Sequence, residues 1–458
     1  MQKLYFSEGL IGRDWAADIC LHVGTGGLIE KLEAGVKAPR GVQIYGPVLP
    51  GMPNLHSHAF QRAFAGLAEF KTPGQSDFWS WRSAMYHFAK HMAPAAVEVI
   101  ARALYIEMLK AGYTSVGEFH YLHNSHNDQA LAMSKAVIKA ADETGIALTH
   151  LPVLYQTSDF GGKAANEGQK PFLHDDKAYA RLLNILAPRL KGRHRLGLCF
   201  HSLRAVPAGG FMPAIEAIDA IDPRAPIHIH IAEQTAEVDA CLKATGKRPV
   251  EWLLENVDVD DRWCLIHATH VNEAEWRGMA ERGVVAGLCP TTEANLGDGI
   301  FPAAEYMAAG GRFGVGSDSH ISIDAREELR LLEYGQRLAR RARTVLAGDE
   351  DGHTGEFLWR SAALGGAQAL GQNVGEIAVG KRADLVVLDG AASQFAGASY
   401  SQIVDAFVLM GQPNPISEVM VAGDWVVRGG KHAQEDEAFA EYRDLVCGIA
   451  AKMEGDAP

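Results

Sequence analysis

The alternation of short apolar runs with longer helical segments constrains the fold more than any other feature of this sequence. Eight runs have the character of buried strands: PGMPNLHSH, YTSVGEFH, ALTHLPVLY, RLGLCFHSL, PIHIHIA, WCLIHATH, VVAGLCP and RFGVGSDS. Such near-continuous apolar runs are typical of a parallel sheet buried on both faces. Eight strand–helix units over more than about 250 residues predict an α/β fold with a (β/α)8 barrel of the TIM type. A doubly wound open sheet is the alternative, because alternation alone does not show that the sheet closes.

The stretch PAAVEVIARALYIEMLKAG shows the helical pattern clearly. Pro94 lies near a first-turn position and Gly112 provides a stop. Val97, Ile100 and Leu104 recur at helical spacing and predict one buried face.

The two ends of the chain differ from the middle. Both are rich in short β-like runs and glycine turns, as in LYFSEGLI near the start and VMVAGDWVVRGGK near the end. We therefore predict a small β-sandwich domain built from residues 1–47 and 377–458, with the catalytic barrel at 48–376. Residues 160–176 and 290–302 are predicted to be long loops, which often line functional sites.

Composition and charge favour a globular protein and argue against nucleic-acid-binding and membrane proteins. The chain has 458 residues, of which 47% are hydrophobic and 22% charged, as in soluble globular proteins. A net charge of −13 argues against broad binding to nucleic acid or to anionic membranes. No uninterrupted apolar run approaches the length of a membrane span, and the N-terminus lacks the apolar core of a signal peptide. The six cysteines show no C-x-x-C spacing, which favours a reducing cytoplasm.

Polar side chains recur at the ends of the predicted strands. His56 and His58 end the first strand, His230 lies near the end of the fifth, His267 ends the sixth and Asp318 follows the eighth. An H-x-H pair alone means little, since roughly one is expected by chance in a chain with 19 histidines. In a barrel, however, these strand ends meet at one rim, where catalytic residues gather.

Imidazole and carboxylate together suit Zn²⁺, with Fe²⁺ as an alternative that accepts the same ligands. The sequence therefore predicts one divalent metal site at this rim. Two further histidines have ordinary explanations. His228 is interpreted as a core residue or as one that supports a ligand, rather than as a ligand itself, and His270 as a surface or capping residue.

Three more residues suit catalysis or substrate binding. Glu233 follows His230 by three positions and could carry a proton between water and a leaving group; an acidic residue at a helix start is the simpler interpretation. Arg204 ends the fourth strand and Arg82 lies in the aromatic stretch SDFWSWRSAMY. Two guanidinium groups near one pocket would suit a small dicarboxylate.

These motifs resemble the amidohydrolase superfamily. HSH at the first strand, HIHIAE at the fifth, His267 and SDS at the eighth carry the resemblance, and GKRADLVVLD is similar to the closing strand of that superfamily's small β domain. Within the superfamily the chain resembles the formiminoglutamate deiminases, in the stretches PNLHSHAFQRAFAGLAE, FWSWRSAMY, AGYTSVGEFHYLH, FHSLRAV and PTTEANLGDGIFP. The resemblance covers nearly the whole chain.

The resemblance implies specific roles. The metal would be held by His56, His58, His230 and Asp318. His267 would orient water, Asp318 would take its proton and Glu233 would move a proton to the departing nitrogen. Residues that would hold the glutamate portion of the substrate are Gln61, Arg82, Tyr121, His201 and Arg204. The fourth strand carries no lysine that could bridge two metals, which agrees with a single ion.

The implied reaction is hydrolysis of the formimino C=N bond of N-formimino-L-glutamate, in histidine degradation, to N-formyl-L-glutamate and ammonia. The resemblance also implies a homodimer. One alternative is an aminohydrolase of the same superfamily that acts on a heteroaromatic base such as guanine. Another is a non-catalytic relative, which is disfavoured because all four ligand positions are filled.

Overall fold

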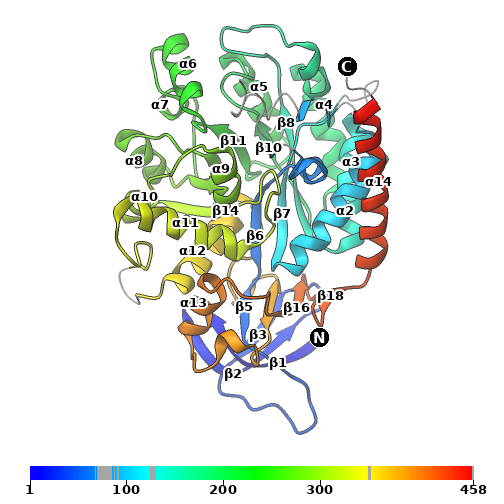
Figure 1. Ribbon diagram of the computed structural model, residues 1–458, viewed down its shortest axis with the longest axis vertical. Helices are drawn as coiled ribbons and strands as arrows, with labels where there is room; N and C mark the ends of the chain where they lie inside the picture. Colours follow the sequence, from blue (N-terminus) through cyan, green and yellow to red (C-terminus); the bar gives the residue numbers. More distant parts are fainter. Residues whose placement is uncertain are drawn as a thin grey trace.

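The structure is a computed structural model that describes residues 1–67, 69, 85–86, 88–89, 92–123, 130–348 and 352–455. Its larger part is a strand barrel surrounded by helices, and a smaller sheet lies at one end, close to the N-terminus (Figure 1). The predicted fold class is therefore confirmed.

The barrel is built from parallel strands that follow one another in chain order. They are β6 (Met52–Ser57), β7 (Tyr113–His120), β8 (Ala147–Leu154), β10 (Leu198–Phe200), β11 (Ile227–Ile231), β12 (Trp263–His267), β13 (Val285–Leu288) and β14 (Arg312–Val315). The two-residue strand β9 (Arg195–Leu196) precedes β10 and pairs with β8. Each of the eight predicted strands is present.

The last strand returns to the first. A parallel bridge pairs Ser57 with Asp318. The backbone N–H of Asp318 donates to the carbonyl of His56 at 3.0 Å, and the N–H of His58 donates to the carbonyl of Asp318 at 3.2 Å. These bonds favour the barrel over the open sheet, and they lie at the end of the strands that carries the predicted ligands.

Helices alternate with these strands. Those of the barrel region are α2 (Pro94–Lys110), α3 (Ala130–Thr144), α4 (Asp176–Leu186), α5 (Ala208–Asp219), α6 (Thr235–Thr245), α7 (Pro249–Asn256), α8 (Glu273–Glu281), α9 (Pro290–Leu296), α10 (Ala303–Ala308), α11 (Ala325–Arg340) and α12 (Thr354–Ala369). Short 3-10 helices are η1 (Ala59–Phe64), η2 (Glu167–Phe172) and η3 (Ala187–Arg189).

Helix α2 begins at Pro94 as predicted and ends just before Gly112, whose φ of +91° suits glycine. The predicted loop at 290–302 is wrong in its first half, because α9 occupies Pro290–Leu296. The predicted loop at 160–176 likewise contains η2.

A second sheet combines both ends of the chain. Its strands are β1 (Gln2–Ile11), β2 (Asp14–Val23), β3 (Ile29–Glu33), β4 (Ile44–Tyr45), β5 (Val48–Pro50), β15 (Leu385–Leu388), β16 (Ile416–Val421), β17 (Asp424–Arg428) and β18 (Lys431–His432). Most neighbours pair antiparallel, and β5 joins the two halves by pairing with β1 and β15. Phe6 and Leu21 share one apolar cluster with Leu385 and Met420, so both ends of the chain bury a common core. The exact limits of the two domains stay a prediction.

The C-terminal part also contributes helices. They are η4 (Ser393–Phe395), α13 (Ser401–Leu409) and α14 (Glu435–Gly455). The red helix α14 runs beside α2 on the outside of the barrel (Figure 1). Lys110 of α2 contacts Glu435 at 2.6 Å, and the hydroxyl of Tyr442 donates to the carbonyl of Arg62.

A cluster of buried apolar side chains lies among the barrel strands. Leu55, Cys264, Ile266 and Val285 belong to one buried cluster that also includes Cys289. Cys264 and Cys289 are therefore core residues, as is Cys199, and all six cysteines are free thiols. Among the described residues, no helix is long and apolar enough to cross a membrane.

Candidate metal centre and active site

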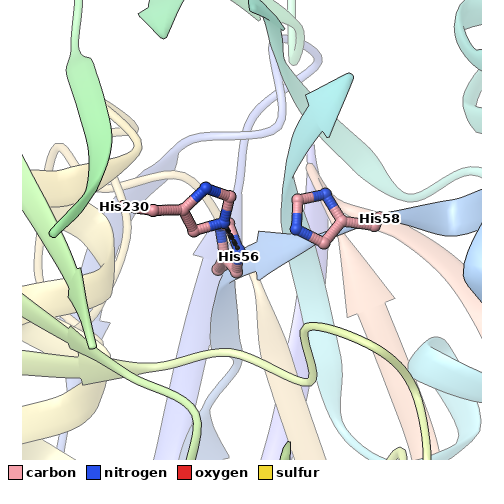
Figure 2. Close-up of side chains that lie close together, drawn as sticks. All are labelled: His56, His58 and His230. Atoms are coloured by element: carbon pink, nitrogen blue, oxygen red, sulfur yellow. Dashed lines mark hydrogen bonds between the residues drawn. The ribbon is translucent and has the colours of Figure 1, made fainter. Parts of the chain in front are cut away.

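Three histidines converge at the rim of the barrel. Figure 2 shows His56 and His58, from the end of β6, facing His230 of β11. One ring nitrogen from each lies within 4.8 Å of the others. The Nε2 atoms of His56 and His230 are only 3.0 Å apart.

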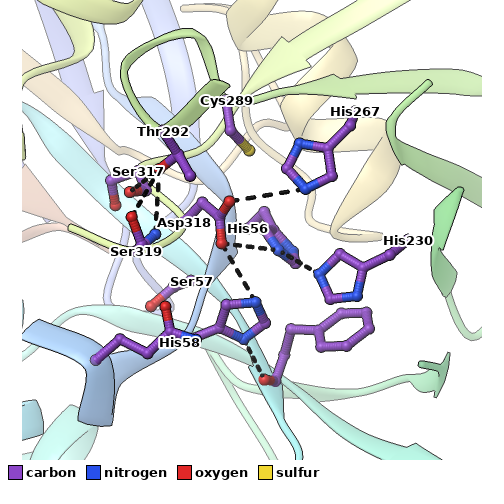
Figure 3. A network of polar contacts seen from close by, with 12 residues as sticks. His56, Ser57, His58, His230, His267, Cys289, Thr292, Ser317, Asp318 and Ser319 are labelled. Carbon is purple, nitrogen blue, oxygen red and sulfur yellow. Dashed lines mark hydrogen bonds and ion pairs between the residues drawn. The ribbon is translucent and has the colours of Figure 1, made fainter. Parts of the chain in front are cut away.

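Asp318 completes the group. Its Oδ1 lies 3.4 Å from Nε2 of His56 and 3.3 Å from Nε2 of His58 (Figure 3). All four predicted metal ligands therefore meet, although they come from three separate strands. Their assignment as ligands remains a prediction.

Backbone contacts orient two of the rings. Nδ1 of His58 contacts the carbonyl of Phe119 at 2.9 Å, and Nδ1 of His230 contacts the carbonyl of His201 at 3.0 Å. A carbonyl only accepts, so each Nδ1 carries the proton and each neutral ring directs the Nε2 lone pair at the cluster. Burial lowers the pKa of His58 and lowers the pKa of His56 and His230 well below the usual value, so the rings stay neutral.

The donor set fits a divalent cation. Four ligands about 2.0–2.1 Å from a tetrahedral zinc ion stand about 3.3 Å from one another, which matches the separations of 3.0–3.4 Å found here. Buried lone pairs at 3.0 Å repel unless a proton or a cation lies between them. Neutral imidazoles with one carboxylate are also the ligands that zinc prefers.

A buried carboxylate fixes the end of β6. Glu118 of β7 accepts a hydrogen bond from the hydroxyl of Ser57 at 2.6 Å and one from the backbone N–H of Ala59 at 2.7 Å. Burial raises the pKa of Glu118 to about 7, while these two donors oppose the shift. Ser57 lies between the two histidines, so Glu118 holds the segment that presents them.

His267 lies beside the candidate ligands. Its Nε2 is 3.7 Å from Oδ2 of Asp318 and 3.7 Å from Oε1 of Glu233. His267, Ala268 and Asp318 all have positive φ values, of 67°, 49° and 44°. Such conformations cost about 1–3 kcal/mol each and are concentrated at functional sites.

Carboxylates gather around His267. Besides Glu233 and Asp318, Glu293 contacts its Nδ1 at 3.2 Å, and Asp298 has an oxygen within 4.8 Å of both Glu233 and His267. Burial opposes protonation of His267, but Glu233, Glu293 and Asp318 outweigh it and raise its pKa to about 10. Burial, reinforced by the neighbouring acids, raises the pKa of Glu233 to about 7 and that of Asp298 to about 9.

The predicted substrate-binding residues line one pocket with the cluster. Gln61, Tyr121, His201 and Arg204 share it with His58 and Asp318. The amide of Gln61 donates to the hydroxyl of Tyr121 at 2.6 Å. Arg82, the fifth predicted residue, lies outside the described residues.

Arg204 contributes a positive charge to the lining of this pocket. It is half-buried, and its guanidinium donates at 3.4 Å to the hydroxyl of Tyr155 and to the carbonyl of Ser158. Glu237, which sequence analysis did not select, also lines the pocket and accepts from the backbone N–H of Glu233 at 3.0 Å.

His228 and His270 lie outside the cluster. His228 contacts the carbonyl of Ala369 at 2.7 Å, and His270 contacts the carbonyl of Asp298 at 2.9 Å. The buried position of His228 confirms its interpretation as a core residue. His270 is half-buried and supports the loop that carries Asp298.

Comparison with known proteins places this site in a family. A model of the amidohydrolase family matches residues 48–426. The chain belongs to the amidohydrolase family. Formimidoylglutamate deiminase from Pseudomonas aeruginosa is 48% identical over 447 residues, which are 96% of this chain and 98% of that protein.

Solved structures agree with the fold of this amidohydrolase. The crystal structure of an amidohydrolase from Brucella melitensis is 43% identical, with a TM-score of 0.92 over 98% of this chain and all of that one. A zinc-bound adenosine deaminase from Xanthomonas campestris is 21% identical, with a TM-score of 0.81 over 98% of both chains, and shows the same fold.

Amidohydrolases are metal-dependent hydrolases, which agrees with the donor set at this rim. The sequence did not lead us to select four carboxylates of the site: Glu118, Glu237, Glu293 and Asp298. The last two lie in PTTEANLGDGIFP, a stretch that supported the resemblance but from which no residue was selected. Its proline start and its glycine stop were the available signals for a short helix.

Proposed function

We propose that this amidohydrolase hydrolyses the formimino C=N bond of N-formimino-L-glutamate, giving N-formyl-L-glutamate and ammonia in histidine degradation. The observation that carries the proposal is the 48% identity, over almost the full length of both chains, to a formimidoylglutamate deiminase. The pocket supports it independently, because its lining offers both carboxylates and a guanidinium group.

The metal end of the pocket is rich in carboxylates and suits a formimino group, which is an amidine and readily carries positive charge. Glu233 and Asp318 both lie there. The lining also includes Arg204, which suits a carboxylate of the glutamate portion. A neutral heteroaromatic base would use neither charge.

Four residues are proposed to hold the cation: His56, His58, His230 and Asp318. When bound, a divalent ion supplies Lewis acidity that lowers the pKa of water and makes it nucleophilic near neutral pH. We propose zinc, with iron as the alternative, because the donor set suits zinc and a distant relative of the same fold contains it.

The glutamate portion is proposed to bind between Arg204, His201 and the pair formed by Gln61 and Tyr121. Arg204 would donate to one carboxylate of the substrate. The carbonyl oxygen of Gln61 is buried and accepts no hydrogen bond from the described residues. It could accept from the N–H that joins the formimino group to the glutamate.

The residues around the reacting carbon would then move protons. Addition of water across the C=N bond gives a tetrahedral carbon with one oxygen and two nitrogens. Asp318 accepts the proton that water loses, and Nε2 of His267 orients that water. Protonated Glu233 transfers its proton to the terminal nitrogen, the bond from this nitrogen to the tetrahedral carbon breaks and ammonia leaves. The hydroxyl proton then passes to the Glu233 carboxylate, so that the oxygen becomes the formyl carbonyl.

Ammonia release by the zinc-loaded protein tests the proposal. We expect rapid release from N-formimino-L-glutamate, weaker release from N-formimino-L-aspartate and almost none from guanine. Strong activity on guanine with none on formiminoglutamate would overturn the proposal in favour of a base aminohydrolase.

Three further expectations belong to this proposal. We propose a homodimer, to be measured by light scattering of the purified protein, and a cytoplasmic location, to be measured by cell fractionation. Arg82 is proposed as a second carboxylate ligand, from either its own or the neighbouring subunit.

A further inference from the structure

Behind the candidate metal centre, a buried polar contact joins His267 to Glu293. The imidazole is almost fully buried, and its Nδ1 lies 3.2 Å from Oε1 of Glu293. The same oxygen accepts the backbone N–H of Cys289 at 2.8 Å. On its other side, the imidazole stacks parallel to the ring of His230, with centroids 5.6 Å apart.

Glu293 is itself held by a rigid support. It belongs to α9, which follows β13 directly and begins with Pro290. Glu328 of α11 fixes the start of α9 by accepting from the backbone N–H of Thr291 at 2.9 Å and from its hydroxyl at 2.6 Å. Thr292 shares a further hydrogen bond with Ser319, next to Asp318. The start of α9 is therefore anchored to α11, whereas the Glu293 carboxylate itself is held by the backbone N–H of Cys289.

A carboxylate accepts hydrogen bonds and donates none. The contact with Glu293 therefore keeps a proton on Nδ1 of His267 in either charge state of the ring. The atom that can exchange a proton is then Nε2, which faces Asp318 and Glu233 at 3.7 Å. Partners of this kind fix the tautomer and the orientation of catalytic imidazoles.

We propose that Glu293 is a positioning residue for the reaction. It keeps the Nδ1 proton of His267 engaged, so that Nε2 always faces the water and the substrate. The inference rests on the proposed deiminase function and adds to it a residue that acts only through His267.

A structural role for Glu293 is the competing explanation, since its bond to Cys289 also tightens the turn from β13 into α9. Glu328 offers a matched control. It is a buried carboxylate that anchors the same short helix, through Thr291, and the hydrogen bonds described for it do not include His267. A purely structural effect should appear in variants of both residues.

The test compares Glu293→Gln with Glu328→Gln in the zinc-loaded enzyme. Loss of a partner of this kind typically costs about 10- to 100-fold. We expect E293Q to lower kcat on formiminoglutamate by about that factor, with KM and zinc content nearly unchanged. We expect E328Q to lower the melting temperature while kcat stays within about threefold of the wild type. Wild-type kcat in E293Q, or an equal loss of kcat in E328Q, would overturn the proposal.

A second readout does not depend on the substrate. An imidazole N–H bonded to a carboxylate gives a low-field proton resonance, which His267→Asn assigns by its loss. The resonance should move upfield in E293Q and remain in E328Q; an unchanged resonance in E293Q would refute the contact. If the wild type is inactive on formiminoglutamate while the resonance behaves as expected, the substrate is wrong and the pairing stands.

Discussion

His56 and Asp318 are joined twice, once through their backbones and once through their side chains. The N–H of Asp318 donates to the carbonyl of His56 at 3.0 Å, and Oδ1 of Asp318 lies 3.4 Å from Nε2 of His56. The first contact closes the barrel and the second belongs to the candidate metal centre. The pairing of these two strands therefore completes the fold and also brings the candidate ligands together. Because the two contacts use different atoms, replacing a side chain should abolish metal binding without opening the barrel.

Replacing Asp318 with asparagine tests whether metal binding can be lost while the fold is kept. The backbone bonds should persist, but one anionic ligand and the proton acceptor are lost. We expect zinc content to fall well below one ion per chain and kcat to fall by more than about 100-fold, while circular dichroism stays native. His228→Gln is the matched control, because His228 lies in the same strand as His230 and contacts Ala369 instead. Full zinc content in D318N would contradict the assignment of Asp318 as a ligand.

Removal of the metal should lower stability as well as activity. A ligand that binds only the native state stabilises it by about 4 kcal/mol when present at 1,000 times its dissociation constant. We expect a chelator to abolish ammonia release and to lower the melting temperature by several degrees. Added zinc should restore both, and the melting temperature of D318N should not respond to either treatment. A wild-type melting temperature that is insensitive to the chelator would argue against a bound ion at this rim.

Arg204 should govern binding of the dicarboxylate. Its guanidinium lines the same pocket as the candidate metal ligands His58, His230 and Asp318. Hydrogen bonds to charged groups contribute about 1.5–3 kcal/mol, so Arg204→Gln should lower kcat/KM on formiminoglutamate by about 10- to 100-fold, mainly through KM. Arg248→Lys serves as the control, since Arg248 pairs with Glu275 outside this pocket. A KM equal to that of the wild type in R204Q would remove Arg204 from the substrate site.

The sequence predicted the barrel and the meeting of the candidate ligands for a definite reason. Parallel strands end at one rim, so residues such as His56, His230 and Asp318 can be placed without knowing any contact between them. Glu293 could not be placed in this way. It lies in a helix of only seven residues between a proline and a glycine, where a loop was predicted. Its role depends on a distance to His267 that no periodicity encodes.

A buried histidine beside the site should make the protein sensitive to acid. Burial lowers the pKa of His120 to about 3, with His174 and His58 adding to the shift. An unfolded histidine, with a pKa of about 6.5, binds a proton below that pH, whereas folded His120 does so only near pH 3. Stability is therefore full above pH 6.5 and is lost progressively as pH falls from 6.5 towards 3.

The matched variant is His120→Asn, which removes this titration. Between pH 7.5 and pH 5, the wild type should lose about 2 kcal/mol more of its unfolding free energy than H120N. Urea unfolding at both pH values, in metal-free protein, measures the difference. Equal pH dependence in the two proteins would show that His120 is not the neutral buried group inferred here.

Gly316 should be essential to the junction between the last and first strands. A Cβ atom at this position would lie 2.7 Å from Cβ of His56 and 2.8 Å from its backbone nitrogen and oxygen. Backbone atoms cannot move aside as a flexible side chain can, so Gly316→Ala should push β14 away from β6 and misplace the candidate ligands. We expect a loss of about 1–3 kcal/mol in unfolding free energy, together with weaker zinc binding. Gly209→Ala is the control, because a Cβ there meets nothing within 4 Å and alanine favours the helix. If G316A bound zinc as tightly as G209A, close contact between the two strands would not be what holds the candidate ligands in place.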